Sequence, residues 1–356
     1  MKKEINNQSG EFENTAILVT GGAGFIGSNL SRMILDQNER VRITIVDNLL
    51  SSERINVPSD RRVKFIKGSI TDDAILNKLK DEFDYVFHLA TYHGNQNSIY
   101  NPLADHQNNV LTTLKLFEKI KNFKKIKKVV YSSSGCSVAK KTFKKAEATK
   151  ENAPIEIRQD SPYSISKIIG EFYSVYYHKQ HNLPVVRARF QNVYGPGEIL
   201  GAGKWRGTTA TVWRNVVPIF IYRAIQNQPL PLENRGIASR DFIFVEDICR
   251  GLILCAIKGK AGDVYNLGSG KETTIKELAE FINKITGNDA GFDYLPKRGW
   301  DSSGKRFAST KKSRKKLGFE ARIDLGQGLK ITIQWTKNNF PLIEKNILKH
   351  SRRLRG

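Results

Sequence analysis

The amino-acid sequence predicts an α/β fold built on a doubly wound parallel sheet, for two reasons. Short apolar strand candidates alternate with longer amphipathic segments from residue 15 onward. Parallel strands need a crossover between them, usually a helix, so this alternation is typical of a parallel sheet with helices on both faces. The second reason is a glycine-rich turn between the first strand candidate and the first helix candidate. Because ligands of such sheets bind beyond the carboxyl ends of the strands, we expect functional residues directly after strands.

The strand candidates are runs of apolar and β-branched residues, and the helix candidates carry apolar residues at helical spacing. A proline after Asp160-Ser161 is suited to the first turn of the last of these helices. The strand candidates cover residues 16–20, 41–46, 63–67, 84–89, 127–132 and 184–189. The helix candidates lie near residues 25–37, 72–81, 103–121 and 161–181, and residues 1–14 are expected to form a loose polar leader.

Length and composition indicate a globular protein with one two-lobed unit or two domains. The chain has 356 residues, and its hydrophobic content of 39% supports a core of substantial size. No run approaches the length of a membrane span, and the polar N-terminus lacks the apolar region of a signal peptide. The three cysteines are odd in number and lack metal-ligand spacing. We therefore expect a reduced cytoplasmic protein without a metal site.

The charge is unusually positive, with 58 Lys and Arg against 35 Asp and Glu, a formal net charge of +23. Such a surface attracts polyanions without specificity. The densest basic runs are residues 119–128 and 349–355. The first has no aromatic residue besides Phe123, which favours a solvated helix end over a nucleic-acid site, and residues 343–356 are expected to form a basic, disordered tail. Nucleic-acid binding is therefore a minor alternative.

The glycine-rich turn within Ile17–Leu30 predicts a dinucleotide site. Gly21 permits a sharp exit from the strand, and Gly24 lets backbone N–H groups approach a pyrophosphate. Gly27 allows the following helix to pack close to the sheet. The helix N-terminus then presents unpaired N–H groups and its positive dipole end to the phosphates.

Asp47 ends the second strand candidate, about 20 residues beyond the last of these glycines. An acidic side chain at this place accepts hydrogen bonds from an adenosine ribose and repels a 2′-phosphate, which favours NAD over NADP. The alternative is an aspartate that only caps the next turn.

Tyr163 and Lys167 are four residues apart at the start of a helix candidate, so they share one face of the helix. A lysine ammonium beside a phenol favours the phenolate, which is a base able to take a proton from an alcohol. The alternative is an ordinary helical pair, but the upstream NAD signals make a base of this kind expected.

The order of these motifs resembles that of the extended short-chain dehydrogenase/reductases. Most members of that family are nucleotide-sugar epimerases, dehydratases or decarboxylases. The resemblance implies a Rossmann-type NAD-binding domain with a smaller α/β lobe that binds a nucleotide sugar. The motifs are GGAGFIG, Asp47, HLAT at 88–91, the serines at 132–134, Tyr163-xxx-Lys167, RFQNVYGPG at 189–197, RDFIFVED at 240–247 and VYNLGSG at 264–270. The implied domains are 15–190 with about 242–268 for NAD, and about 191–241 with 269–342 for the nucleotide sugar.

The resemblance also implies roles for individual residues. Ser134 would hydrogen-bond the reacting hydroxyl, Tyr163 would be the base, and Lys167 would position the nicotinamide ribose. The implied cofactor-binding residues are Gly21, Gly24, Phe25, Ile26, Gly27, Asp47, Asn48, Ser69, Ile70, Leu89, Ala90, Thr91, Asn109, Ser132, Tyr163, Lys167 and Gln191. The implied substrate-binding residues are Ser134, Asn192, Lys204, Arg240 and Arg298, where an arginine fork suits a pyrophosphate.

The residues after Ser134 bear on the reaction. Dehydratases and decarboxylases that resemble this chain carry carboxylates where Gly135-Cys136 stand here, so both activities are disfavoured. A 4-epimerase needs no further acid, because the keto sugar turns and takes the hydride back on its other face. GDP-mannose 3,5-epimerases resemble the chain in having a cysteine here and a lysine near the place of Lys204. Cys136 and Lys204 would then exchange protons beside the ketone, although a space-filling cysteine and a basic loop residue explain them equally well.

The sequence therefore predicts an NAD-dependent nucleotide-sugar epimerase of the 4-epimerase type, acting through a transient keto sugar. The alternatives are a 3,5-epimerase-like or other keto-sugar enzyme, and a non-catalytic NAD-binding protein with a basic surface for nucleic acid. The resemblance also implies a homodimer formed through the helices near 103–121 and 161–181. Their apolar residues Leu111, Leu114, Phe117, Phe172, Val175 and Tyr176 are explained equally well by core burial.

Overall fold

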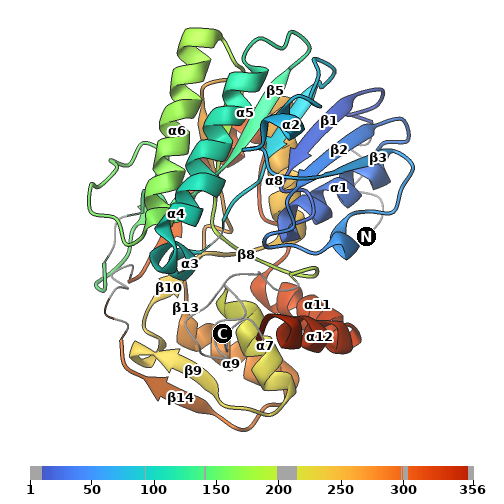
Figure 1. Ribbon diagram of the computed structural model, residues 1–356. Coiled ribbons are helices and arrows are strands. Elements are labelled where there is room, and N and C mark those ends of the chain that lie inside the picture. Colours follow the sequence, from blue (N-terminus) through green and yellow to red (C-terminus); the bar gives the residue numbers. More distant parts are fainter. Residues whose placement is uncertain are drawn as a thin grey trace.

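The computed structural model describes residues 10–92, 94–139, 142–198, 215–297, 299 and 304–351. Its centre is a seven-stranded parallel sheet in the order β12-β7-β5-β4-β1-β2-β3, in the upper part of Figure 1. The predicted fold class is confirmed. The strands are β1 (Ala16–Thr20), β2 (Arg42–Asp47), β3 (Val63–Lys67), β4 (Tyr85–His88), β5 (Lys128–Ser134), β7 (Val185–Phe190) and β12 (Val264–Leu267).

Strand β1 shows why the sheet strands are apolar throughout. Ile17 and Val19 belong to one hydrophobic core, whereas Ala16 and Leu18 belong to the core on the opposite face. Successive side chains of a strand point to opposite faces, so a strand covered on both sides is apolar at every position. Helices α1 and α8 cover one face, and α5 and α6 cover the other (Figure 1).

Three of the four predicted helical segments lie close to their predicted positions, whereas α3 and α8 were not predicted. The segment predicted as a helix over 72–81 is helical only at Asp73–Leu76, because tight turns after Asn77 bring Leu79 and Phe83 into the core. Around the sheet lie α1 (Phe25–Gln37), α2 (Asp73–Leu76), α3 (Asn95–Tyr100), α4 (Pro102–Asp105), a π-helical segment (His106–Leu111), α5 (Thr112–Ile120), α6 (Pro162–His181) and α8 (Val245–Lys258). Short 3-10 helices cover Arg54–Asn56, Gly135–Ser137 and Asn234–Gly236.

A smaller lobe lies beyond the carboxyl ends of the sheet strands, in the lower part of Figure 1. It contains short two-stranded sheets that pair β14 with β9, β10 with β13, and β11 with β8, and a further pair joins β15 to β6. The strands are β6 (Ala148–Thr149), β8 (Asn192–Tyr194), β9 (Leu230–Glu233), β10 (Ser239–Arg240), β11 (Phe242–Phe244), β13 (Thr273–Thr274), β14 (Phe292–Leu295) and β15 (Phe307–Ala308). The helices are α7 (Val216–Ile225), α9 (Ile275–Thr286), α10 (Lys311–Leu317), α11 (Leu325–Asn338) and α12 (Phe340–Ser351).

Both ends of the described chain are more ordered than the sequence suggests. The expected basic tail begins at residue 343, yet α12 continues to Ser351 and its Ile343 is buried. The expected loose leader ends at residue 14, yet the turn before β1 buries Phe12 against Tyr85, with ring centroids 4.9 Å apart. A single aromatic anchor explains this, because one buried ring removes enough apolar surface from water to fix a short segment. None of the described helices has the length and apolar character needed to cross a membrane.

Replacing Phe12 with Ala tests whether this segment belongs to the core. Because the ring is 1% exposed, we expect a loss of about 3 kcal/mol in the free energy of unfolding, measured by urea denaturation. The neighbouring exposed Glu11 provides the control, since Glu11→Ala should change stability by less than about 0.5 kcal/mol. A Phe12→Ala variant as stable as the control would show that the segment lies outside the cooperative core.

Candidate active site

A cavity of about 480 Å³ lies where the carboxyl ends of the sheet strands meet the smaller lobe. It is lined by the β1–α1 turn, the ends of β2, β4, β5 and β7, the start of α6, and residues of β9 and β10. This volume is within the range of small-molecule sites. The position agrees with the expectation that ligands bind beyond the strand ends.

The glycine-rich turn forms one wall of the cavity. A Cβ on Gly21 would lie 2.6 Å from the Ala90 nitrogen, and Gly21 also has a φ of +73°, so a side chain is excluded there. A Cβ on Gly27 would lie 2.5 Å from the Gly21 oxygen, so this glycine permits α1 to begin directly against the turn. Helix α1 has no side-chain cap and no acidic residue in its first turn. Its N–H groups and dipole therefore favour an anion at this wall, as a dinucleotide pyrophosphate requires.

Asp47 lies at the end of β2, is buried and lines the same cavity. Its carboxylate accepts hydrogen bonds from the Ala23 nitrogen at 3.0 Å, the Leu49 nitrogen at 2.8 Å and the Ser52 hydroxyl at 2.8 Å. Burial raises the pKa of Asp47, and these donors oppose the rise. The side chain therefore caps the turn after β2, which is one of the two roles predicted for it. It also lines the cavity, where the other predicted role would place an adenosine ribose.

The other expected cofactor-binding residues line the cavity, with Asn109 as the exception. Asn109 lies behind the wall, where its side-chain oxygen accepts hydrogen bonds from the Thr91 hydroxyl at 2.9 Å and the Tyr92 nitrogen at 2.7 Å. It therefore supports the segment that follows β4 and does not line the cavity. The cavity is lined by Gly21, Gly24, Phe25, Ile26, Gly27, Asp47, Asn48, Ser69, Ile70, Leu89, Ala90, Thr91, Ser132, Tyr163, Lys167 and Gln191.

Ser132 lies at the end of β5 and lines the cavity. Its hydroxyl is buried and has no hydrogen-bond partner in the part of the chain that the structure describes. A buried hydroxyl without a partner is costly, so such groups usually mark a ligand or an ordered water. The space left by the glycines, the uncapped N-terminus of α1 and the nearby Asp47 are the features that fit a bound dinucleotide.

Ser134, Tyr163 and Lys167 line the cavity together, although they come from β5 and from α6. The Lys167 ammonium lies 5.8 Å from the centre of the Tyr163 ring and donates a hydrogen bond to the Ser132 oxygen at 2.9 Å. Burial lowers the pKa of Lys167 to about 8, and the Asp105 carboxylate opposes this shift. The Ser134 hydroxyl lies 3.0 Å from the Cys136 sulfur, which also lines the cavity.

Helix α6 is positioned by its first turn and by a close contact with β5. The Ser161 hydroxyl accepts a hydrogen bond from the Ser164 nitrogen at 3.3 Å, and Pro162 occupies the first turn, as predicted. A Cβ on Gly170 would lie 1.9 Å from the Tyr131 hydroxyl, so only glycine allows the helix to approach β5 this closely. The helix is thereby fixed beside β5.

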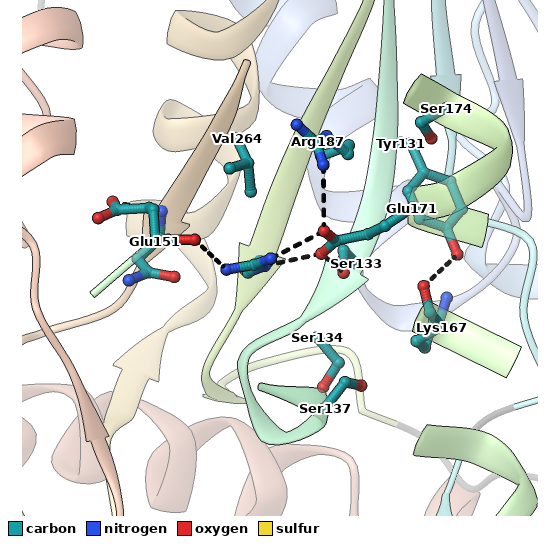
Figure 2. A network of polar contacts seen from close by, with 12 residues as sticks. Tyr131, Ser133, Ser134, Ser137, Glu151, Lys167, Glu171, Ser174, Arg187 and Val264 are labelled. Atoms are coloured by element: carbon teal, nitrogen blue, oxygen red, sulfur yellow. Dashed lines mark hydrogen bonds and ion pairs between the residues drawn. The ribbon is translucent and has the colours of Figure 1, made fainter. Parts of the chain in front are cut away.

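Behind the catalytic candidates, the buried carboxylate of Glu171 connects α6 to two strands. It accepts hydrogen bonds from the Ser133 hydroxyl at 2.5 Å and from two nitrogens of Arg189, at 2.7 and 2.8 Å. Figure 2 shows Glu171 between Arg187 and Ser133, with Ser134 close by. Burial alone would raise the pKa of Glu171, but the hydrogen bonds from Arg189 hold it below its usual value. This role could not be predicted from the sequence, because the three elements meet only in the fold.

Asp105 is a second buried carboxyl that sequence reasoning missed. Its carboxylate accepts a hydrogen bond from the Asn109 side chain at 2.7 Å, and that amide also lies 3.2 Å from the Ser166 hydroxyl beside Lys167. A π-helical segment, His106–Leu111, follows Asp105 directly and contains Asn109. Burial raises the pKa of Asp105 to about 6, opposed by Ser166 and Lys167. The Asp105 carboxyl and the Lys167 ammonium therefore shift each other's pKa through their charges.

The expected substrate-binding residues are only partly described. Asn192 and Arg240 line the cavity together with Ser134. Arg240 donates hydrogen bonds from one nitrogen to the Ser239 and Gly304 oxygens, at 2.7 and 2.6 Å, which holds its guanidinium in place. Lys204 and Arg298 lie outside the described residues. The described residues include no cluster of His, Cys, Asp and Glu that could hold a metal ion.

Comparisons with known proteins agree with this geometry. WbmF of Bordetella bronchiseptica, solved in complex with NAD+ and UDP, has 58% identity and a TM-score of 0.86, over 97% of this chain and 98% of WbmF. A UDP-glucose 4-epimerase of Thermotoga maritima, solved with UDP-glucose, has 30% identity and a TM-score of 0.81, over 91% and 99% of the two chains. A dTDP-glucose 4,6-dehydratase of Streptomyces antibioticus is 30% identical over 91% of this chain and 92% of its own.

The family model described as the NAD dependent epimerase/dehydratase family matches residues 17–268. This range begins in β1 and ends just after β12, so it contains every strand of the central sheet. The chain therefore belongs to the NAD-dependent epimerase/dehydratase family, the extended short-chain dehydrogenase/reductases that the motifs resemble, whose cofactor is NAD.

Proposed function

We propose that the protein is a nucleotide-sugar epimerase of the 4-epimerase type. The observation that carries this proposal is the set of side chains at the end of β5. Ser134, Tyr163 and Lys167 surround one part of the cavity, and the 3-10 turn after Ser134 offers Cys136 and no carboxylate. The acidic residues that line the cavity, Asp47, Glu198 and Glu233, come from other parts of the chain. Elimination of water from a keto sugar needs a proton donor beside the leaving hydroxyl, which this turn lacks.

In the proposed reaction, Tyr163 takes the proton of a sugar hydroxyl while the Ser134 hydroxyl holds that oxygen in place. The Lys167 ammonium stabilises the resulting phenolate, provided that the lysine itself is charged. Bound NAD supplies hydride acceptance and return. Since the proton and the hydride leave together, the sugar carbon becomes a ketone, and the reverse transfer onto its other face gives the epimer. Asn192 and Arg240 would hold the nucleotide diphosphate while the sugar turns.

Replacing Tyr163 with Phe removes the proposed base and nothing else from the cavity. We expect kcat to fall roughly 100- to 10,000-fold, with NAD content unchanged. The readouts are product formation from UDP-hexoses and the absorbance of cofactor released on denaturation. Tyr294→Phe on β14 is the control, because that ring is 54% exposed and lies outside the cavity. Retention of activity in the Tyr163 variant would exclude this residue as the base.

The pH dependence tests the charge of Lys167. With a pKa of about 8, the lysine is charged below that pH and loses its proton above it, so kcat should fall on the alkaline side near pH 8. Asp105→Asn removes the carboxylate that opposes the effect of burial, so the alkaline limb should move to lower pH. The exposed Asp289 offers a matched control in Asp289→Asn. A uniform loss of kcat at all pH values, without a shift, would mean that Asp105 is only structural.

A second candidate function is proton exchange beside the ketone, as in a 3,5-epimerase. The Cys136 sulfur favours it, because it lines the cavity 3.0 Å from the Ser134 hydroxyl. A thiolate there would remove a proton from a carbon that the neighbouring ketone has made acidic. Its expected partner, Lys204, lies outside the described residues.

Turnover in deuterium oxide separates the two candidates. Hydride return alone carries no solvent hydrogen to the sugar carbons, so we expect no deuterium at any ring carbon of the product by NMR. Deuterium incorporation that disappears in Cys136→Ser would instead establish the proton-exchange route. Equal product formation by both proteins, without deuterium, would leave Cys136 as a space-filling residue.

We also propose that the protein forms a homodimer through α6 and the helical segments that cover residues 103–121. Phe117 is buried in the core of the subunit, whereas Phe172 is 58% exposed and Tyr176 is 51% exposed on α6. Ile165 and Leu103 extend this surface at 47% and 81% exposure. Exposed apolar faces of this kind usually bury themselves against a partner. Light scattering that gives the mass of a monomer would contradict this proposal.

A further inference from the structure

The side-chain amide of Gln191 lies against the turn that follows Ser134. Gln191 joins β7 to β8 and lines the cavity together with Ser134 and Cys136. A Cβ on Gly135 would lie 1.9 Å from Nε2 of Gln191 and 2.9 Å from its Oε1. The amide therefore occupies the space that a side chain at position 135 would fill, one residue beyond the hydroxyl that the proposed reaction uses.

Gly135 serves this contact, because its own backbone does not require glycine. Its φ lies outside the left-handed region, and the residue belongs to an ordinary 3-10 turn. Gly268 provides the second part of the space, because a Cβ there would lie 2.6 Å from Cγ of Gln191. Two glycines from distant segments of the chain thus make room for one glutamine, with its amide at Gly135 and its stem at Gly268.

The backbone on both sides of this glutamine is held by hydrogen bonds. The Gln191 nitrogen donates to the Leu267 oxygen at 3.1 Å, and the Asn192 nitrogen donates to the Asp241 oxygen at 2.9 Å. The carboxylate of Asp241 is itself buried and accepts a hydrogen bond from the Ser269 nitrogen at 2.8 Å. The side chain of Gln191 therefore starts from a fixed point at the strand ends, as a preorganised binding group requires.

The chemistry of a primary amide limits what this side chain can bind. The Gln191 amide makes no hydrogen bond with any residue that the structure describes, and the residue is only partly buried. Its N–H groups and its oxygen are therefore available to a ligand in the cavity. An amide has no charge and both donates and accepts hydrogen bonds, so it fits a neutral polar group such as a hydroxyl or another amide.

The strand order indicates which ligand this amide faces. In the sheet, β7 lies on one side of β5, and β4 and β1 lie on the other. The glycine-rich turn that fits the dinucleotide follows β1. Gln191 at the end of β7 is therefore on the side of Ser134 that points away from this turn, where the sugar would lie.

We propose that Gln191 is a specificity-determining residue that binds a neutral polar substituent of the sugar, on a carbon next to the one that is oxidised. The inference rests on the proposed function, because it needs a nucleotide sugar whose reacting oxygen lies at Ser134. A site built to hydrogen-bond a hydroxyl or an N–H group rejects the analogue that lacks this group. Gln191 thereby selects sugars by a substituent that does not react.

Calorimetry on the purified holoprotein tests the proposal without turnover. The ligands are UDP, UDP-glucose and UDP-N-acetylglucosamine, measured for the wild type, Gln191→Ala and Gln334→Ala. Gln334 is exposed on α11 and does not line the cavity, so its variant is the matched control. We expect Gln191→Ala to weaken binding of at least one of the two sugars roughly 3- to 10-fold, as for a neutral hydrogen bond, and to leave the affinity for UDP unchanged.

The contact with Gly135 gives an independent test. Gly135→Ala places a methyl group where the amide lies, so it should weaken the same nucleotide sugar as Gln191→Ala does. In the Gln191→Ala background, Gly135→Ala should have almost no further effect, because the amide is already absent. Additive effects of the two changes would show that Gly135 does not act through Gln191 and would overturn the proposal.

Three other results would also overturn it. The first is unchanged affinity of Gln191→Ala for both sugars. The second is equal weakening of UDP and its sugars, which would place Gln191 at the nucleotide. The third is loss of bound NAD at unchanged circular dichroism, which would make Gln191 a cofactor-binding residue, as the resemblance implies. If the wild type binds neither these ligands nor the GDP, CDP and dTDP counterparts, the proposed function itself fails.

Discussion

The buried carboxylate of Glu171 fixes the distance between helix α6 and strands β5 and β7, and the candidate active site depends on that distance. The carboxylate binds Ser133 of β5 and Arg189 of β7, while Lys167 lies one helical turn before it and donates to the Ser132 oxygen. The helix that carries Tyr163 and Lys167 is thereby fixed to the strand that carries Ser134. Breaking such a buried pair is costly, because the remaining charge has no other partner. The geometry of the site is therefore part of the core of the protein.

Electrostatics divides the cavity into regions with different tasks. At the β1–α1 turn, the helix N-terminus offers N–H groups and a partial positive charge to one anion. At the end of β5, a buried lysine and a buried carboxyl, Lys167 and Asp105, influence each other's proton binding. On the lobe side, Arg240 and Arg306 provide full positive charges. A dinucleotide that spans the sheet and a diphosphate held by the lobe fit this distribution, and their reactive ends would meet beside Tyr163.

Several of these features can be predicted from short stretches of the sequence. The turn around Gly21 and Gly27 can be recognised because local backbone geometry demands glycine at both positions. The helix that begins after Ser161 is similarly marked by its cap and its first-turn proline. Strand β5 extends two residues beyond the prediction, because Ser133 and Ser134 pair with β7, and a serine run has no apolar signal.

The rest depends on contacts between distant segments. Glu171 and Arg189 look like ordinary charged residues until α6 and β7 are brought together. Asn109 is predicted to contact the cofactor, but it does not line the cavity, and its side chain donates to Asp105 and Ser166 behind the wall. Phe12 lies in a polar stretch, and only the fold shows that it reaches the core.

The central claim is that this cavity oxidises and then reduces one carbon of a nucleotide sugar, with no net loss of water or carbon dioxide. The most direct measurement is NMR and mass spectrometry of the products after incubation with UDP-, GDP-, CDP- and dTDP-hexoses and the corresponding hexuronates. The account predicts that one of these substrates reaches equilibrium with its C4 epimer, at unchanged mass and without net reduction of NAD. A 4-keto-6-deoxy product, 18 Da lighter by loss of one water as in dehydratase chemistry, would contradict it.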